Sequence, residues 1–127
     1  MSIPQTVLLV DDEVHIRVLL RRVLGQLGVP HVFEAKDGQE ACSLYAQHRP
    51  DVVLMDINMP LMSGVEALEK ITEADPQATV VMLTSLGSRQ AVERCADGGA
   101  MAYLRKDIPL NELSERLRKT FAELEEE

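Results

Sequence analysis

Five polar residues follow short apolar runs in this sequence, and their types are those that bind metal ions and phosphoryl groups. Asp11 and Asp12 end the segment LLVDD, and Asp56 ends DVVLMD. Thr84 ends VVMLT, and Lys106 follows AYLR. A buried carboxylate destabilises a protein by several kcal/mol unless a partner compensates its charge. An acidic pair directly after a core segment therefore needs a chemical explanation.

A divalent cation supplies that explanation. Three converging carboxylates repel one another unless a cation joins them. A few carboxylates completed by water suit Mg²⁺ better than a dedicated Ca²⁺ site. Asp11 and Asp12 would hold the metal opposite Asp56, whose carboxylate could attack phosphorus and form an aspartyl phosphate. Lys106 and the Thr84 hydroxyl would then stabilise oxygens of the transferred group.

Each of these residues also has an ordinary structural interpretation. An aspartate after a strand, such as Asp12, is often a helix cap. A threonine at a strand end is usually structural, and an isolated lysine is usually solvated. Because capping does not require three acids to converge with a lysine, the combination favours a Mg²⁺-dependent phosphoryl site.

The elements that must position these residues alternate along the chain. Short apolar runs predict strands at 7–10, 31–35, 51–55, 78–83 and 101–104. Apolar stripes and start signals predict helices over 16–27, from Asp37, from Ser63, over 88–97, and from Pro109 to Leu124. Asp37 and Ser63 each precede a glutamate by three residues, which is the spacing of a capping box.

Strict alternation of five strands with five helices predicts an α/β fold, with a parallel sheet covered by helices on both faces. The runs at 51–55 and 78–83 are almost continuously apolar, as is typical of strands buried on both faces. Ligands of such open sheets bind at the carboxyl ends of the strands, where all five polar residues fall. Residues 1–127 contain no visible linker or repeat and predict one domain.

The composition argues against several classes of protein. The formal charge of -8 disfavours nonspecific binding to nucleic acid or anionic membranes. No apolar run approaches the ~20 residues that a membrane span needs, and the start MSIPQT lacks the features of a signal peptide. Cys42 and Cys95 have no metal-binding spacing and are expected to be free thiols. These features favour a cytoplasmic protein.

Four segments, LLVDDE, LMDINMPLMSGVEAL, MLTS and AYLRKD, resemble the receiver domain of two-component response regulators, the CheY-like family. The resemblance extends over essentially the whole chain, and four separated motifs in the family's order make it specific. It implies a flavodoxin-like three-layer sandwich whose parallel sheet has the strand order 2-1-3-4-5. No output domain is expected within residues 1–127.

The resemblance also implies a role for each site residue. Asp56 would accept the phosphoryl group, and the acidic pair would bind Mg²⁺ together with the backbone carbonyl of Asn58. The phosphoryl group would contact Thr84 and Lys106. Tyr103, three residues before the lysine, would be the aromatic switch residue whose ring moves inward when the threonine hydroxyl is drawn to the phosphate.

Two features concern the lifetime and shape of this site. The resemblance implies that the side chains of Asn58 and Leu86 flank the path of the attacking water. Leu86 offers no hydrogen bond to orient that water, so autodephosphorylation is expected to be slower than in a Leu86→Glu variant. Receivers commonly have a proline in a cis peptide bond after the lysine, whereas Asp107 follows Lys106 here. A non-proline cis bond costs roughly 3 kcal/mol, so the resemblance leaves the isomer of this bond open.

The expected function is that of a phosphorylation-activated signalling switch. A sensor histidine kinase or a phosphotransfer protein would phosphorylate Asp56, and the surface of the fourth helix, fifth strand and fifth helix would then bind a downstream target or an output domain. The chain would catalyse only its own phosphorylation and dephosphorylation and would not be an enzyme for other substrates. Whether it forms a homodimer is open, and no direct contact with nucleic acid or a membrane is expected.

Several alternatives share parts of this pattern. A docking module with the receiver fold could signal by binding alone, and the chain could be an excised receiver of a DNA-binding regulator. A phosphatase of the haloacid dehalogenase type would need an aspartate where Asn58 stands. A flavin-binding module of the flavodoxin type would need a hydroxyl- and glycine-rich loop in place of DDEVHIR.

Overall fold

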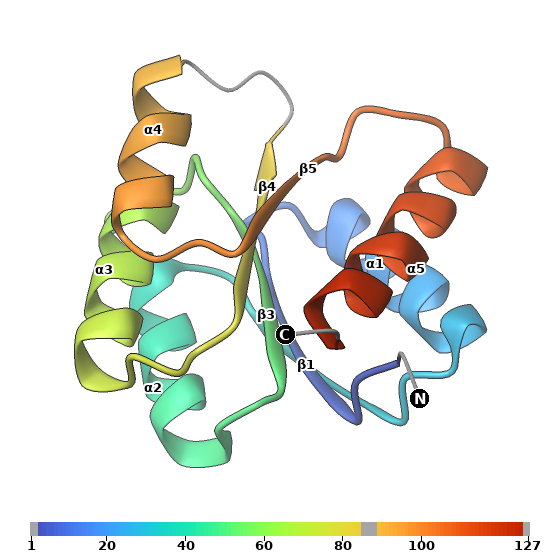
Figure 1. The fold of residues 1–127 in the computed structure, drawn as a ribbon, viewed down its shortest axis with the longest axis horizontal. Helices are drawn as coiled ribbons and strands as arrows, with labels where there is room; N and C mark the ends of the chain where they lie inside the picture. The colour runs from blue at the N-terminus through green and yellow to red at the C-terminus, as the bar shows by residue number, and fades with distance from the viewer. Residues whose placement is uncertain (1–2, 85–88, 126–127) are drawn as a thin grey trace.

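The computed structural model describes residues 3–84 and 89–125, and they form alternating strands and helices (Figure 1). The strands are β1 (Thr6–Val10), β2 (His31–Ala35), β3 (Val52–Asp56), β4 (Val80–Thr84) and β5 (Ala102–Arg105). The helices are α1 (Val14–Leu27), α2 (Gly38–His48), α3 (Gly64–Ala74), α4 (Arg89–Asp97) and α5 (Leu110–Glu125). In this part of the chain no helix has the length and apolarity to cross a membrane.

The five strands form one parallel sheet in the order β2-β1-β3-β4-β5. Helices α1 and α5 cover one face of this sheet, and α2, α3 and α4 cover the other (Figure 1). The predicted flavodoxin-like three-layer sandwich is therefore confirmed. All strands run in the same direction, so the residues that follow β1, β3, β4 and β5 lie along one rim.

The core is divided by the sheet into two apolar clusters. Every residue of β3 and β4 is buried, as predicted for strands covered on both faces. Alternate residues of β1 enter different clusters: Leu8 packs with the α2 and α3 side, and Leu9 with the α1 and α5 side. This alternation follows from the two-residue period of a strand.

Side chains at the predicted helix starts make the expected hydrogen bonds. Asp37 Oδ1 accepts the Glu40 N–H at 2.8 Å, and Ser63 Oγ accepts the Glu66 N–H at 3.3 Å. The reciprocal bond of the first box goes one residue further back, because the Glu40 carboxylate accepts from the Lys36 N–H at 3.1 Å. These bonds fix the first turns of α2 and α3 by satisfying free backbone donors.

Asp12 does not cap α1. Glu13 occupies the N-cap position, and its side chain makes no capping hydrogen bond. Asp11 Oδ1 accepts the Glu13 N–H at 2.9 Å instead. The turn between β1 and α1 is therefore held by the buried acid, and the exposed one is left facing the rim.

A close backbone approach fixes the loop after β3. A side chain at Gly64 would place its Cβ 2.0 Å from the carbonyl oxygen of Asp56. The Gly64 N–H also donates to the Ile57 carbonyl at 2.8 Å. Only glycine fits between the start of α3 and the end of β3, and this contact fixes the position of the Asp56 main chain.

Candidate phosphoryl and metal site

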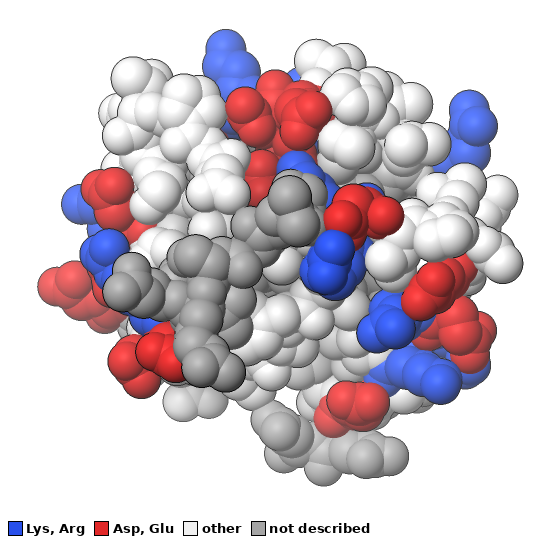
Figure 2. All heavy atoms as spheres, turned by 90° about the horizontal axis from the view of Figure 1, so that it is seen from above, with Lys and Arg blue, Asp and Glu red and all other residues white. Residues whose placement is uncertain are grey.

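Three carboxylates meet at the carboxyl ends of β1 and β3, which are neighbours in the sheet. One carboxylate oxygen from each of Asp11, Asp12 and Asp56 lies within 4.8 Å of the other two. Asp11 and Asp56 are buried, and Asp12 is exposed. Figure 2 looks onto the molecule from this end and shows acidic side chains gathered between surfaces that carry no charge. The structure thus brings together the three acids that the sequence singles out.

The donor set of this cluster fits Mg²⁺. Carboxylate oxygens are the ligands that Mg²⁺ prefers, and it usually retains water where only a few of them bind it. The exposed Asp12 leaves one side of the cluster open to solvent. The backbone N–H of Asn58 hydrogen-bonds to the Asp56 carboxylate, which places Asn58 beside the cluster. The ligand role of the Asn58 carbonyl stays a prediction.

Lys106 directly follows β5 and reaches the acids along the same rim, across the end of β4. Its Nζ lies 2.8 Å from Asp11 Oδ2, 3.1 Å from Asp56 Oδ2 and 3.5 Å from Glu13 Oε1. Its side chain is only 7% exposed. The Lys106 N–H donates to the Thr84 carbonyl at 2.9 Å, which fixes the backbone at the end of β5. The ammonium therefore compensates two buried carboxylates in the metal-free protein.

These contacts shift two pKa values. Burial raises the pKa of the Asp56 carboxyl to about 6, and the negative charge of Asp11 adds to the rise, whereas Lys106 opposes it. Burial lowers the pKa of the Lys106 ammonium, but its hydrogen bonds and the charges of Asp11 and Asp56 outweigh burial and leave that pKa above its usual value. The lysine stays charged, and the Asp56 carboxylate is more basic than an exposed one.

Thr84 presents a buried hydroxyl at the same rim. It ends β4, between the strands that carry Asp56 and Lys106. Among the described residues, no group hydrogen-bonds its Oγ1. A buried hydroxyl without a partner costs about 1–3 kcal/mol, so the position favours a group that enters the site and accepts this bond.

The remaining predicted site residues either lie near the cluster of three acids or fall outside the described residues. Tyr103 is half-buried on β5, paired in register with Met82, and packs against the cluster on the α2 and α3 side. Leu86 lies outside the described residues. The peptide bond between Lys106 and Asp107 is trans, since no cis bond occurs in the described residues. Asp107 accepts two hydrogen bonds from the Arg105 guanidinium, at 2.9 and 2.7 Å.

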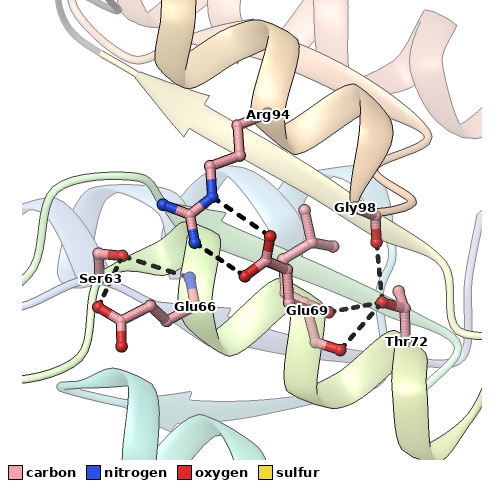
Figure 3. Close-up of polar contacts among 7 residues, drawn as sticks. Ser63, Glu66, Glu69, Thr72, Arg94 and Gly98 are labelled. Carbon is pink, nitrogen blue, oxygen red and sulfur yellow. Dashed lines mark hydrogen bonds and ion pairs between the residues drawn. The ribbon is translucent and has the colours of Figure 1, made fainter.

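Helix α4 is attached to α3 at its C-terminal end (Figure 3). The Arg94 guanidinium donates to both carboxylate oxygens of Glu69, at 3.3 and 3.0 Å. The Thr72 hydroxyl donates to the Gly98 carbonyl at 2.8 Å. The sequence pattern did not reveal these bonds, because they join α3 to α4 and to the residue after it, and only the fold defines how these segments lie relative to one another.

Comparisons with known proteins agree with this arrangement. The family model described as the response regulator receiver domain matches residues 7–118. Chemotaxis protein CheY of Bacillus subtilis is 34% identical over 114 residues, which cover 90% of this chain and 95% of that protein. Transcriptional regulatory protein PdtaR of Mycobacterium tuberculosis is 42% identical over 112 residues, or 88% of this chain. The chain spans only 54%, about half, of the length of PdtaR.

A solved structure gives the same result at the level of the backbone. The CheX-CheY-BeF3-Mg²⁺ complex from Borrelia burgdorferi matches with a TM-score of 0.85 at 35% identity, covering 94% of this chain and 90% of that chain. The strand order of this chain, its cluster of three acids and the extent of the family match lead to one conclusion. The chain belongs to the CheY-like family of response regulator receiver domains, which serve two-component signalling.

Proposed function

We propose that this protein is a phosphorylation-activated switch in which Asp56 accepts a phosphoryl group from a phosphohistidine of a partner protein. One observation carries the proposal. Three carboxylates, a buried ammonium and a buried hydroxyl without a described partner converge at the ends of β1, β3, β4 and β5. Each group matches a requirement of phosphoryl transfer to a carboxylate.

In the transfer step, a carboxylate oxygen of Asp56 attacks phosphorus. An O–P bond forms, the P–N bond of the phosphohistidine breaks, and its electron pair goes to the imidazole nitrogen, which takes a proton from solvent. Lys106, already 3.1 Å from Asp56 Oδ2, would stabilise negative charge on one phosphoryl oxygen. The Thr84 hydroxyl would donate to another.

Asp11, Asp12 and Asp56 would hold Mg²⁺, with the Asn58 carbonyl as a further ligand. When bound, the metal would neutralise negative charge on the phosphoryl group and on the acids around it. The complex from Borrelia burgdorferi contains Mg²⁺ together with a CheY that is 35% identical to this chain, which supports the same assignment here.

The switch would pass from the site to the surface formed by α4, β5 and α5. A phosphoryl group adds a charge of about -1.5 to -2, and a bond from the Thr84 hydroxyl to it would end that hydroxyl's lack of a partner. Tyr103, half-buried on β5, would follow the threonine inward. A downstream protein that prefers this conformation would shift the population toward it.

The chain would catalyse only its own phosphorylation and dephosphorylation. CheY matches over 95% of its length and PdtaR over 54%, so relatives carry this domain both nearly alone and within a longer protein. The proposed switch applies to either setting.

Incubation with acetyl phosphate and Mg²⁺, followed by intact mass spectrometry, tests the proposal. We expect the mass of one phosphoryl group to be added to the parent protein and not to Asp56→Asn. Asp51→Asn is the matched control, because Asp51 lies away from the rim and accepts from the Gln5 and Thr6 N–H groups, which asparagine can also do. Equal labelling of parent and Asp56→Asn, or none in either, would contradict the proposal, and the second result would favour a module that signals by binding alone.

A further inference from the structure

Arg17 on α1 makes a contact with the acidic rim that its place on the helix does not suggest. Its Nη1 donates to the backbone carbonyl of Asp11 at 2.5 Å, and its Nε donates to Glu34 Oε1 at 3.2 Å. Its side chain is only 15% exposed, although arginine is mostly exposed in proteins. The guanidinium thus bridges β2 and the main chain at the end of β1.

Glu34 holds this arginine in place with the help of a second one. It lies on β2, paired in register with Leu9. Its other carboxylate oxygen accepts from Arg21 Nη1 at 2.5 Å, and Arg21 lies one helical turn after Arg17. Two arginines therefore share one carboxylate, but only Arg17 reaches Asp11.

The main chain at Asp11 is consequently held from both sides. Its N–H donates to the Ala35 carbonyl at 3.1 Å, and its carbonyl accepts from Arg17. That carbonyl belongs to the peptide unit that joins Asp11 to Asp12. Because a peptide unit is planar, a bond that fixes the carbonyl also fixes the direction in which the Asp12 main chain continues.

Asp12 depends on this bond more than Asp11 does. The Asp11 carboxylate is held directly by the Glu13 N–H and by Lys106, at 2.9 and 2.8 Å. The exposed Asp12 carboxylate has no hydrogen bond or ion pair with any described residue. Its orientation toward the other two acids therefore rests on the backbone that carries it.

We infer that Arg17, held by Glu34, is a positioning residue for the Mg²⁺ site, acting through the peptide unit between Asp11 and Asp12. The inference rests on the proposed function, since it assigns Mg²⁺ to these acids. Groups that hydrogen-bond to metal ligands commonly orient those ligands. Loss of such a group weakens metal affinity about 10–100-fold.

For the change in Mg²⁺ affinity when the Arg17 charge is removed, the inference and simple electrostatics predict opposite signs. Removal of a positive charge near an acidic cluster should strengthen binding of a cation, because one source of repulsion is lost. Loss of the Arg17 guanidinium should instead weaken Mg²⁺ binding, because the acids lose their fixed orientation. Arg21→Met is the matched control: it removes the same charge from the same helix and the same carboxylate, but no contact with Asp11.

Isothermal titration of each metal-free protein with Mg²⁺ tests this without any phosphoryl transfer. We expect Arg17→Met to raise the dissociation constant about tenfold, Arg21→Met to leave it within about twofold, and Arg17→Lys to fall between them, since one ammonium cannot replace both bonds. Thermal unfolding in EDTA shows whether each variant is folded. If Arg17→Met does not fold, Arg17→Lys against Arg21→Lys gives the same comparison.

Two outcomes would overturn the inference alone, and they are distinguishable from failure of the proposed function. If the parent binds Mg²⁺ and takes a phosphoryl group, yet the Arg17 variants bind Mg²⁺ as tightly or more tightly, the positioning role is wrong and the function stands. If the Arg17 and Arg21 variants weaken binding equally, the effect is not specific to the Asp11 carbonyl. A parent protein that does not bind Mg²⁺ overturns both.

Discussion

Lys106 Nζ lies 3.1 Å from Asp56 Oδ2, with both side chains almost completely buried. The two residues are far apart in the sequence, and the strand order brings them near each other, because β3 and β5 lie on either side of β4. The lysine lowers the pKa of Asp56, whereas burial raises it. Substitution of the lysine should therefore change both the proton affinity and the reactivity of the aspartate.

We expect Lys106→Met to slow phosphorylation of Asp56 by acetyl phosphate roughly 100-fold, because a charged donor to the phosphoryl group is lost. In the metal-free variant, the pKa of Asp56 should rise above its value of about 6 in the parent. Carboxyl carbon shifts in an NMR titration report the pKa, and intact mass reports the rate. An unchanged or lower pKa would contradict the electrostatic role of Lys106.

Thr84→Val should separate stability from function. The Thr84 hydroxyl is buried, and no described group hydrogen-bonds it, so an isosteric valine should stabilise the free protein by about 1 kcal/mol. The same change should reduce the yield or lifetime of the phosphorylated state, and Thr84→Ser should retain it. Chemical denaturation without Mg²⁺ and the decay of labelled protein measure the two effects. Destabilisation by valine would show that the hydroxyl is satisfied in solution.

Leu61→Asn should stabilise the protein. Leu61 has a φ of 68° and a side chain that is 94% exposed, and the Met62 N–H bonds back to the Pro60 carbonyl at 2.8 Å. This is a γ-turn of the rare, strained type. Asparagine tolerates a positive φ better than leucine does, so we expect a gain of about 1 kcal/mol. Leu61→Val is the control and should destabilise in the same denaturation experiment.

Tyr45→Phe should lower stability in a pH-dependent way. The Tyr45 hydroxyl donates to Asp75 Oδ2 at 2.7 Å and is the main cause that lowers the pKa of Asp75 from 3.8. A lowered carboxyl pKa stabilises the fold above pH 3.8, and this contribution is lost as the pH falls through the lowered value. Burial and the same bond raise the pKa of Tyr45 from 10.0 to about 12, so its contribution is present below pH 10 and is lost as the pH rises to 12.

The difference in unfolding midpoint between parent and Tyr45→Phe should therefore be largest near neutral pH and should shrink at both extremes. Thermal unfolding across the pH range measures it. In an Asp75→Asn background the pH dependence at the acid end should disappear, because the titrating group is gone. A difference that does not vary with pH would mean that Tyr45 acts by packing alone.

The fold could be predicted from the sequence because its local signals agree with one another. The valine-rich runs define β3 and β4, and Asp37 and Ser63 begin α2 and α3 as expected. The errors are at boundaries: β4 begins at Val80 and not at residue 78, and β5 ends at Arg105 and not at residue 104. Pairing with neighbouring strands sets these ends, and the sequence of one strand does not show where its neighbour begins or ends.

The site could be predicted as far as residue type and strand end define it. Asp11, Asp12 and Asp56 meet as expected, and Lys106 reaches them. Arg17 and Glu13 were not anticipated, and both contact the rim. Arg17 lies off the apolar stripe of α1 and resembles a solvated residue, because its partner Glu34 comes from another element. Glu13 directly follows the acidic pair in the sequence, and this position could have indicated that it lies at the same rim.

The bonds that join α3 to the last part of α4 and to the residue after it have a mechanical consequence. Arg94 and Gly98, which bond to α3, lie in the last part of α4 and just after it, whereas Thr84 lies on the side of its first turn. A helix of nine residues is about 13 Å long, so a tilt of about 10° around the attached end would displace the first turn by about 2 Å. Displacement would grow with distance from the pivot. A partner that distinguishes the phosphorylated from the unphosphorylated protein should therefore contact the N-terminal half of α4. A partner that contacts the half near Gly98 should bind both states with similar affinity.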